Sequence, residues 1–566
     1  MVAPHHKYRL RVTLSFLVVV LCSQALSEEP FDVAEIDSVI RETFEYHENP
    51  GLAVTVVRNG QVLFSGGYGV EDKDTQEPVT DNTVFGIASV SKGFAATLLV
   101  KLLYEKTNLT VDSKVRELLG NGFKMPDDFR TSEMTFADLM AHRTGVPANN
   151  RIRFSNNLTR ENLMDHIALL PAPHQFRVKY FYSNIMYGLV TRLAEIVGEA
   201  SWEQLIRENL FEPLGMENST FLTDVDWSRN NVATAYSQKM TGEEVRVSHE
   251  FSKRWALLAG SGAVMTTAND MTRWMHFHLY GGKNLSDKQV VQEERLNEVH
   301  KARFRITPTV SKDTRVPRFP VTSSEDVYAH GFRRGYYRGY ERLTHTGSTI
   351  GYRAMLSLLP KHKIGVFTVM TGKDDSYKYR VPLHMYLLDR ALGFQSWLNS
   401  STICSYPKPW KTAKKSSPPP KLDASLKLQR DIEEYEGTYH NPAYGYLEIS
   451  YNKTLTSLVM TFGWGIWRLF PRPKLSGDKF YGDGLDITVA FDISPIEFLG
   501  ASDNETHIVA VKATAFEPTV PPVFEKVGLT KPGNFSPAFG CSSLTYASSF
   551  IMVIWLMTLR VQGEFF

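Results

Sequence analysis

The stretch Val84-Phe-Gly-Ile-Ala-Ser-Val-Ser-Lys-Gly-Phe-Ala-Ala-Thr97 decides how the chain is interpreted. From Phe94 onward the apolar residues recur at helical spacing, which predicts a helix that begins near Ser89. Ser89 and Lys92 then lie one turn apart on the same face of that helix. A serine hydroxyl becomes an effective nucleophile when a nearby base takes its proton, and a helix N-terminus favours developing negative charge. Ser89 is therefore a candidate nucleophile, and Lys92 is its candidate base.

The S-x-x-K spacing alone is weak evidence, because three other pairs in the chain share it. These pairs are Ser405/Lys408, Ser450/Lys453 and Ser476/Lys479. Ser89 differs from the other serines because it stands at the start of a long helix that is predicted to be amphipathic. Its position, more than its spacing from Lys92, favours Ser89 as the nucleophile.

A second candidate motif is Tyr182-Ser-Asn184, which lies just before a predicted apolar helix at residues 186–197. A phenol hydroxyl at this place can relay a proton, and a carboxamide can hold a substrate amide. The pattern recurs at Tyr439-His-Asn441, and the alternative for Tyr182 is a buried tyrosine that satisfies a backbone carbonyl. Tyr182 and Asn184 are candidates for proton transfer and substrate binding.

A third candidate motif is His345-Thr-Gly-Ser348, which precedes a predicted strand at residues 354–359. Gly347 would let an incoming carbonyl approach the backbone closely. The backbone N–H groups of Ser348 and Ser89 are then the predicted oxyanion donors. A single histidine is more often a surface residue or a hydrogen-bonded core residue than a catalyst, so a role for His345 depends on the other motifs.

Two predicted hairpins frame the segment that carries these motifs. Residues 53–57 and 62–64 are β-rich runs around Asn59-Gly60, a strong hairpin signal, and a second hairpin is predicted at residues 354–370. Helical periodicity recurs between them, at residues 94–103, 111–119, 187–197 and 271–279. The pattern predicts an α+β (α/β) fold with an antiparallel sheet formed from both ends of the domain. An all-helical lobe is inserted into it, and a cleft is expected between lobe and sheet.

The motifs S-x-x-K, Y-x-N and H-T-G, in this order, resemble those of the serine β-lactamase-like and penicillin-binding protein superfamily. The similarity is nearest to class C β-lactamases, DD-peptidases and related esterases. It covers residues from about 50 to 390 and includes blocks at 84–97, 139–147, 262–271 and 345–352. The resemblance implies a serine hydrolase that works through an acyl-enzyme on an amide or ester. By this resemblance Ser89 is the acylated nucleophile, Lys92 and Tyr182 share the base role, Asn184 orients the substrate, and His345, Thr346, Gly347 and Ser348 line the binding strand.

The sequence departs from most β-lactamases at His345, where they carry lysine. A histidine is mostly neutral near pH 7, so it cannot hold a substrate carboxylate as a permanent ammonium does. A peptidase or esterase is therefore favoured over an antibiotic lactamase, and Arg353 is a candidate replacement anion site. The alternative function is a catalytically inactive extracellular binding or extracellular-matrix protein on the same fold.

The length of 566 residues predicts two or three domains. The predicted organisation is a signal peptide at 1–27, a hydrolase domain at 31–395, a linker rich in proline, lysine and serine at 396–430, an all-β domain at 431–528 and a tail with an apolar segment at 529–566. The all-β domain alternates apolar and polar residues between turns and resembles the lipocalin-like barrels appended to some family members. It covers the cleft, binds a partner or only packs against the first domain.

Both ends of the chain bear on localisation. Basic residues, a short apolar run and small residues precede position 28, which is typical of a secretory signal. N-x-S/T sequons support passage through a glycosylating pathway. They lie at Asn108, Asn157, Asn218, Asn284, Asn399, Asn452 and Asn504, with an eighth at Asn534 made doubtful by Pro537. We expect a secreted, extracellular protein. The apolar tail resembles a GPI-attachment signal, so the alternative is a cell-surface protein attached to the membrane only through this tail.

Charge and cysteine content exclude several function classes. A formal net charge of +2 gives no field that recruits nucleic acid or an anionic membrane. Cys22, Cys404 and Cys541 do not have zinc-ligand spacing, and no phosphate-binding glycine loop occurs at a strand-helix junction. We expect a small-molecule or peptide substrate, no metal and no other cofactor, and the sequence leaves the oligomeric state open.

Overall fold

The structure is a computed structural model that describes residues 30–228, 231–306, 319–412, 420–423, 425–472, 478–500 and 507–528. The predicted signal peptide and tail, together with Ser476 and Asn504, lie outside these residues. None of the helices in the described ranges has both the length and the apolar composition that a membrane span requires.

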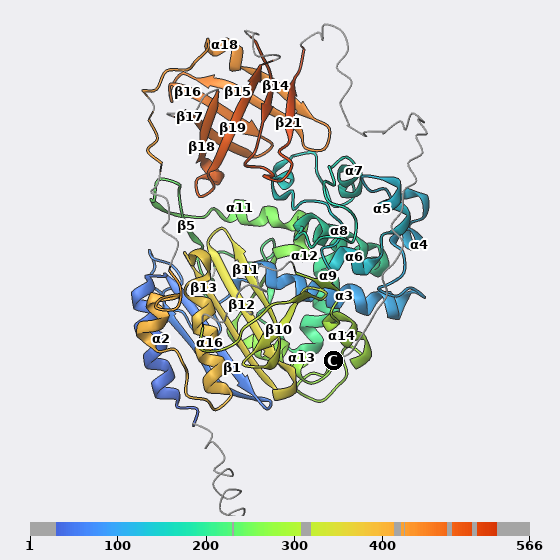
Figure 1. Cartoon of the computed structure of the whole chain (residues 1–566), viewed down its shortest axis with the longest axis vertical. Coiled ribbons are helices and arrows are strands. Elements are labelled where there is room, and N and C mark those ends of the chain that lie inside the picture. The colour runs from blue at the N-terminus through green and yellow to red at the C-terminus, as the bar shows by residue number, and fades with distance from the viewer. Residues whose placement is uncertain are drawn as a thin grey trace, which may run out of the picture. The chain divides into compact units, whose positions relative to one another are not determined.

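The first domain is built on an eight-stranded antiparallel sheet with the order β2-β1-β13-β12-β11-β10-β9-β8 (Figure 1). The strands are β1 (Gly51–Arg58), β2 (Gln61–Gly69), β8 (Phe304–Arg305), β9 (Val327–Tyr328), β10 (Arg333–Tyr337), β11 (Tyr340–Thr349), β12 (Tyr352–Leu359) and β13 (Ile364–Thr371). Two strands come from the start of the domain and six from its end, with the helical segment between them. This arrangement confirms the predicted fold class.

The first hairpin forms because its turn residues accept left-handed backbone angles. Asn59 and Gly60 have φ angles of 52° and 79°, as a tight hairpin turn requires. β1 then pairs with β13, with Val54 opposite Thr368. Strands from opposite ends of the domain thus become neighbours at the centre of the sheet.

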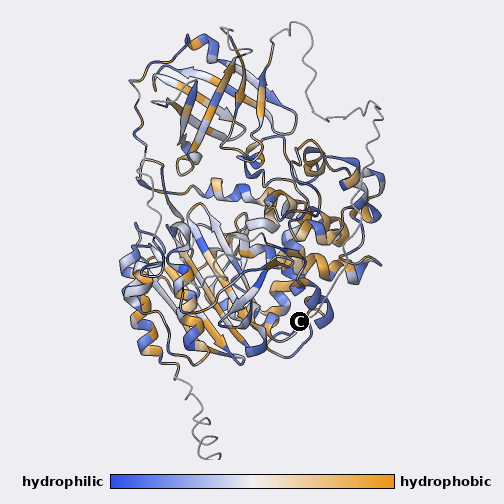
Figure 2. Cartoon of the chain, viewed as in Figure 1, coloured by the Kyte–Doolittle hydropathy of each residue, from blue (hydrophilic) through white to orange (hydrophobic). Residues whose placement is uncertain are grey.

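Both faces of the sheet are buried. α2 (Val33–His47) and α16 (Arg380–Ala391) share a core with Val54 and Val56 of β1, whereas Ala53 belongs to the core of the helical lobe. Successive strand residues point to opposite faces, so a strand covered on both sides is apolar throughout. Figure 2 shows hydrophobic residues along the central strands and on the helices that cover them.

The inserted lobe is mostly helical, but the prediction that it is all-helical is wrong, because it also contains a three-stranded sheet, β3-β7-β4, and a two-stranded sheet, β5-β6. These short strands are β3 (Phe85–Gly86), β4 (Thr220–Phe221), β5 (Tyr236–Gln238), β6 (Glu244–Arg246) and β7 (Val264–Thr266). Its helices include α3 (Ser91–Lys106), α4 (Val115–Leu119), α5 (Asp128–Glu133), α6 (Phe136–Met140), α7 (Leu163–Ala168), α8 (Asn184–Gly198), α9 (Trp202–Ile206), α10 (Glu212–Leu214), α11 (His249–Lys253), α12 (Ala259–Gly262), α13 (Ala268–Leu279) and α14 (Glu293–His300). The expectation that α3 is amphipathic is wrong. Every residue from Ser91 to Val100 is buried, because α8, α12 and α14 pack around this helix.

The second domain is a closed eight-stranded antiparallel barrel, which confirms the all-β prediction. Its strands are β14 (Gly437–Asn441), β15 (Gly445–Asn452), β16 (Ser457–Phe462), β17 (Gly465–Pro471), β18 (Lys479–Leu485), β19 (Ile493–Gly500), β20 (Ile508–Lys512) and β21 (Val523–Lys526), preceded by the short helix α18 (Ile432–Tyr435). Buried aromatic side chains fill its core, among them Phe462, Trp467, Phe498 and Phe524.

The barrel shares a hydrophobic core with the helical lobe. The ring centroid of Phe154 in the lobe lies 4.0 Å from that of Trp464 and 5.4 Å from that of Phe491 in the barrel. His166 Nδ1 lies 2.7 Å from the carbonyl oxygen of Ala443. These contacts join the barrel to the part of the helical lobe that contains Phe154 and His166.

The first part of the predicted linker packs on the first domain instead of connecting loosely. Residues 400–405 form α17 (Ser400–Ser405), in which Ile403 is buried against the core beneath α2. Trp397 donates from its indole nitrogen to the hydroxyl of Tyr337 at 3.1 Å. This region is rich in proline and lysine, but it also contains apolar residues, such as Trp397 and Ile403, that pack on the first domain.

Candidate active site

Ser89 lies in a single 3-10 turn, Ala88–Val90, that leads directly into α3. Ala88 has a φ of 45°, an angle uncommon for a residue with a side chain. Ser89 is only half-buried, whereas its neighbours Ala88 and Val90 are fully buried. The turn therefore presents the one polar side chain of this segment toward accessible space.

The amine of Lys92 is bound to three oxygens, including that of Ser89. Its Nζ lies 3.1 Å from Ser89 Oγ, 2.7 Å from Asn184 Oδ1 and 2.8 Å from the carbonyl oxygen of Ser261. Asn184 stands at the start of α8 and Ser261 lies in α12, so three helices converge on this amine.

Burial favours the neutral form of Lys92. Desolvation of the fully buried amine, helped by the positive charge of Arg333, holds the pKa of Lys92 well below its usual range. A neutral amine has two N–H donors and one lone pair. Asn184 Oδ1 and the Ser261 carbonyl can only accept, so they take both donors, and the lone pair is left for the hydroxyl proton of Ser89.

Tyr182 lies close to both Ser89 and Lys92. Its hydroxyl is hydrogen-bonded to Ser89, and Lys92 Nζ lies 4.8 Å from the centroid of its ring. Burial raises the pKa of Tyr182 above its usual value. Tyr182 therefore keeps its proton near neutral pH, whereas burial favours the neutral form of Lys92.

Asn184 positions Lys92 through both ends of its carboxamide. Its oxygen accepts from Lys92, and its Nδ2 donates to Asn150 Oδ1 at 2.8 Å. The sequence predicts that Asn184 orients the substrate. In the structure the side chain lines the pocket described below and also links the base to Asn150.

His345 is placed differently from the expectation that it lines the binding strand. Its ring is 2% exposed, with Nε2 at 2.9 Å from the Tyr328 hydroxyl and Nδ1 at 2.8 Å from the carbonyl of Thr346. The carbonyl fixes the proton on Nδ1, so Nε2 accepts from Tyr328. Burial, with Arg333 and Lys92 nearby, holds the pKa of His345 well below its usual range. A lysine here would place a buried cation near Arg333.

The rest of this strand lies beside the nucleophile turn. β10 pairs with β11 only from Tyr340 to Thr344, and the following residues of β11 contact the turn that carries Ser89. Thr346 is half-buried and Ser348 is exposed to the pocket. The predicted oxyanion donors, the N–H groups of Ser89 and Ser348, remain a prediction.

Gly347 allows a close backbone approach, but by the protein itself and not by a substrate carbonyl. A Cβ at this position would lie 2.1 Å from the carbonyl oxygen of Ile87, which precedes the nucleophile turn. The backbone of β11 can therefore pack directly on the turn that holds Ser89. Gly347 sets the distance between the strand and the nucleophile.

We expect Gly347→Ala to lower the free energy of unfolding by about 1–3 kcal/mol, because either the strand or the turn must move to accept the methyl group. Urea denaturation of the purified protein measures the change. Gly122→Ala is the matched control, since a Cβ there would meet nothing within 4 Å, and we expect a change within about 0.5 kcal/mol. Equal stability of Gly347→Ala and wild type would contradict the close packing.

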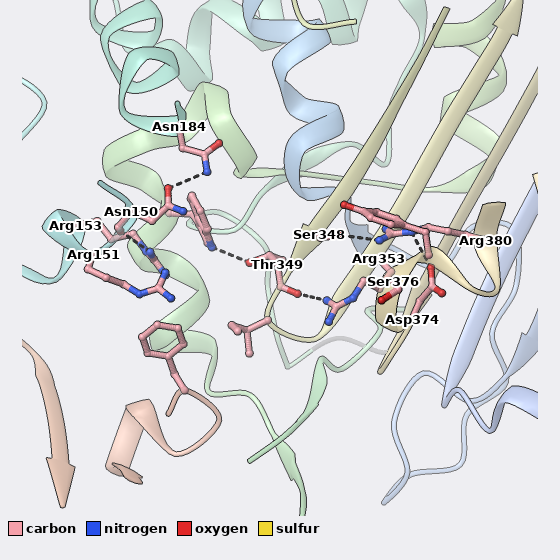
Figure 3. A pocket seen from close by; sticks show the side chains of 14 residues that line it. Asn150, Arg151, Arg153, Asn184, Ser348, Thr349, Arg353, Asp374, Ser376 and Arg380 are labelled. Atoms are coloured by element: carbon pink, nitrogen blue, oxygen red, sulfur yellow. Dashed lines mark hydrogen bonds and ion pairs between the residues drawn. The ribbon is translucent and has the colours of Figure 1, made fainter. Parts of the chain in front are cut away.

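A pocket of about 370 Å³ reaches Asn184, the residue that binds Lys92, although Ser89 itself is not among the described residues that line it (Figure 3). The described residues that line it are Asn150, Arg151, Arg153, Asn184, Trp255, Ser348, Thr349, Ile350, Arg353, Asp374, Ser376, Tyr377, Arg380 and Phe491. Asn184, Ser348 and Arg353 were predicted from the sequence. Arg353 faces the pocket and donates to the carbonyls of Thr349 and Tyr352. The sequence missed the other arginines, because single arginines far apart in the chain form no motif.

Arg380 is the most tightly bound of these arginines. It donates to the carbonyl of Gly347 and, at 2.7 Å, to Ser348 Oγ, and its Nε lies 2.8 Å from Asp374 Oδ2. This buried ion pair holds the end of β11 in place from the side opposite the nucleophile turn. Arg380 begins α16, whose sequence gives no sign of a site.

An antiparallel sheet formed from both ends of a domain, with a helical insertion that begins at the Ser89 turn, is the fold of the β-lactamase type. Residues 36–388 match the Beta-lactamase family. The chain belongs to this family, whose members are typically serine hydrolases.

Individual relatives share parts of the chain. Gigasin-6 of Magallana gigas is 31% identical over 269 residues, which cover 47% of this chain and 87% of that protein. Unguisins hydrolase ungD of Aspergillus violaceofuscus is 24% identical over 379 residues, or 64% of this chain and 65% of that protein. The structure of the octameric penicillin-binding protein homologue from Pyrococcus abyssi matches with a TM-score of 0.52 at 20% identity, over 87% of this chain and 100% of that chain. This last similarity shows a shared fold.

Proposed function

We propose that the protein is a serine hydrolase that forms an acyl-enzyme at Ser89 on an amide or ester substrate. The observation that supports this most is the Lys92 amine, which is buried, has a lowered pKa and lies 3.1 Å from Ser89 Oγ. A lysine kept neutral by burial is a base ready to accept a proton. A relative named as a hydrolase, unguisins hydrolase ungD, agrees with this proposal.

In the proposed acylation step, the Ser89 hydroxyl gives its proton to the Lys92 amine while Oγ bonds to the substrate carbonyl carbon. The carbonyl oxygen becomes an oxyanion, for which the N–H groups of Ser89 and Ser348 are the proposed donors. The Tyr182 hydroxyl gives a proton to the leaving nitrogen or oxygen as its bond to carbon breaks, and Lys92 returns a proton to Tyr182. Water then attacks the acyl group with Lys92 again as base, which releases the acid and restores Ser89.

We assign peptide or ester substrates to this site in preference to antibiotic lactams. His345 stands where most β-lactamases carry lysine, and its buried neutral ring offers no ammonium at that position of the strand, where those enzymes hold the lactam carboxylate. The test is turnover of chromogenic esters and amides by the full chain, with and without a serine-directed fluorophosphonate. We expect turnover that the fluorophosphonate blocks. Folded protein with neither turnover nor covalent labelling would overturn the proposal and favour a binding protein on the same fold.

We also propose that the protein is secreted and glycosylated. The support is the leader sequence together with the positions of the sequons. Five of the six described sequon asparagines are exposed: Asn108, Asn157, Asn218, Asn399 and Asn452. The sixth, Asn284, is half-buried and donates its Nδ2, the atom that carries a glycan, to the carbonyl of Pro213 at 2.8 Å.

Peptide mapping of protein collected from the medium of expressing eukaryotic cells tests this proposal. We expect glycans at the five exposed asparagines and the lowest occupancy at Asn284, because its amide nitrogen is already bound in the fold. Retention of the full chain inside the cell, or a complete lack of glycans in the collected protein, would contradict it.

A further inference from the structure

Four arginines line the pocket that Asn184 also lines, and they form two walls. Figure 3 shows Arg353 and Arg380 on one side, Arg151 and Arg153 on the other, and Thr349 between them. Among the described residues that line the pocket, Asp374 is the one carboxylate, and it is paired with Arg380. The positive charge that remains in the lining lies largely on the wall of Arg151 and Arg153.

This second wall is buried and incompletely hydrogen-bonded. Arg153 is 1% exposed, and the Nε atoms of both Arg151 and Arg153 are buried without a hydrogen-bond partner. The Arg153 side chain donates to the carbonyl of Asn150 at 2.7 Å, and its guanidinium carbon lies 4.3 Å from the ring centroid of Trp255. Burying a guanidinium is costly unless an opposite charge or hydrogen-bond acceptor meets it. Among the described residues, the charge of Glu517 attracts Arg151, but Glu517 accepts from backbone N–H groups, and no carboxylate acts on Arg153. The donors of this wall therefore suit an anionic ligand.

The wall stands beside the catalytic group. Arg151 and Arg153 belong to the 3-10 segment Asn150–Phe154. The first residue of this segment accepts a hydrogen bond at 2.8 Å from Asn184, the residue that binds Lys92 at 2.7 Å. Asn184 therefore links the proposed base Lys92 to the wall, and it lines the same pocket as Arg151 and Arg153.

The barrel holds this 3-10 segment in place. Glu517 accepts from the backbone N–H of Asn149 at 3.1 Å, and Tyr444 donates to Asn149 Oδ1 at 2.8 Å. The indole of Trp464 donates to the carbonyl of Arg153 at 3.1 Å. The guanidinium carbon of Arg151 lies 4.3 Å from the ring centroid of Phe491, a barrel residue that itself lines the pocket. Glu517 is committed to backbone N–H groups, so it orients the segment without pairing with the arginines.

We propose that Arg151 and Arg153, held by the barrel, bind a carboxylate of the substrate, so that the natural substrates are amides or esters with an acidic acyl group. This inference rests on the proposed function and adds a substrate class to it. Planar guanidinium groups suit a planar carboxylate because they offer parallel N–H donors. The barrel then contributes to specificity, since its residues place one wall of the substrate pocket.

The test compares two esters of matched length, p-nitrophenyl hydrogen glutarate and p-nitrophenyl valerate, on the full-length protein. The readout is the ratio of their kcat/KM values, which removes effects common to both substrates. We expect wild type to favour the glutarate ester and Arg151→Gln and Arg153→Gln each to lower the ratio by about 10- to 100-fold, the size of a lost charge-assisted hydrogen bond. We expect Phe491→Ala to lower the ratio less, because this variant keeps the Arg151 guanidinium and removes only the aromatic ring that packs against it.

Arg254→Gln is the matched control. Arg254 also lies over a barrel aromatic ring, at 5.1 Å from the centroid of Trp464, but it does not line the pocket. We expect it to keep the wild-type ratio. An unchanged ratio in folded Arg151→Gln, or an equal fall in Arg254→Gln, would overturn the proposal. Because Arg151 is only half-buried, we expect Arg151→Gln to fold. This variant therefore tests the proposal even if Arg153→Gln does not fold.

A binding measurement separates this proposal from the proposed function. Calorimetric titration of Ser89→Ala with glutarate requires no turnover. We expect binding that Arg151→Gln in the same background weakens by about 10-fold or more. Glutarate binding with no turnover by wild type would reject the proposed hydrolase activity and support the carboxylate site. Turnover with neither glutarate binding nor a preference for the glutarate ester would support the hydrolase and reject the carboxylate site.

Discussion

Ser89→Ala is expected to lower kcat/KM for a chromogenic ester by at least about 10⁴-fold, the scale seen when an acyl-enzyme nucleophile is removed. The substitution deletes one oxygen from a half-buried position at the start of α3 and leaves the packing of Ala88 and Val90 intact. The fold should therefore be preserved. Steady-state kinetics and thermal unfolding of the same preparation measure both effects.

Two serines with the same S-x-x-K spacing serve as matched controls. Ser405 lies in α17 and Ser450 lies exposed in β15, both away from the pocket. We expect Ser405→Ala and Ser450→Ala to keep wild-type kcat/KM. More than a small residual activity in Ser89→Ala, or a large loss at either control, would show that the nucleophile is misassigned.

Lys92→Met is expected to reduce kcat/KM by about 10³- to 10⁴-fold, and Tyr182→Phe by less, since general-base catalysis contributes about 10²- to 10⁴-fold. In the proposed mechanism the neutral Lys92 amine takes the first proton, whereas Tyr182 retains its own because burial raises its pKa. Kinetics of the two variants on one ester substrate measure the difference.

The pH profile provides a second measurement for the same assignment. The pKa of Lys92 is lowered in the folded protein, so the active, neutral form accumulates as pH rises through that value. We expect kcat/KM to rise with pH on the acid side, to level off before the usual range of a free lysine, and to lose this limb in Lys92→Met. Lys453→Met, in the matching Ser450/Lys453 pair, should leave the profile unchanged. An acid limb that survives in Lys92→Met and disappears in Tyr182→Phe would assign the base to Tyr182 instead.

Local sequence patterns predicted the fold well, because they depend on neighbouring residues. The Asn59-Gly60 turn and the β-rich runs on either side of it determine the first hairpin, and the apolar spacing from Phe94 onward predicts the helix α3. Short sequence motifs likewise identify Ser89, Lys92 and Tyr182 as candidates, and in the structure these side chains lie close together. Their order along the chain was sufficient to recognise the family pattern.

Features that depend on tertiary packing could not be predicted in this way. Nothing in the sequence shows that α3 is enclosed by other helices or that the His345 ring lies in the interior between Tyr328 and Thr346. Arg151 and Arg380 are more than two hundred residues apart in the sequence. Only the folded chain places them on opposite walls of one pocket. Phe491 reaches the same pocket from the second domain, a contact that no local pattern records.

Peptide mapping after treatment with a fluorophosphonate tests most directly whether Ser89 is a nucleophile activated by Lys92. The reagent phosphonylates an activated serine and stays attached, so mass spectrometry locates the modified residue. We expect a single adduct on Ser89, none at any site in Ser89→Ala, and slower formation in Lys92→Met. An adduct on a different serine, or no adduct on protein shown to be folded, would contradict the assignment of Ser89.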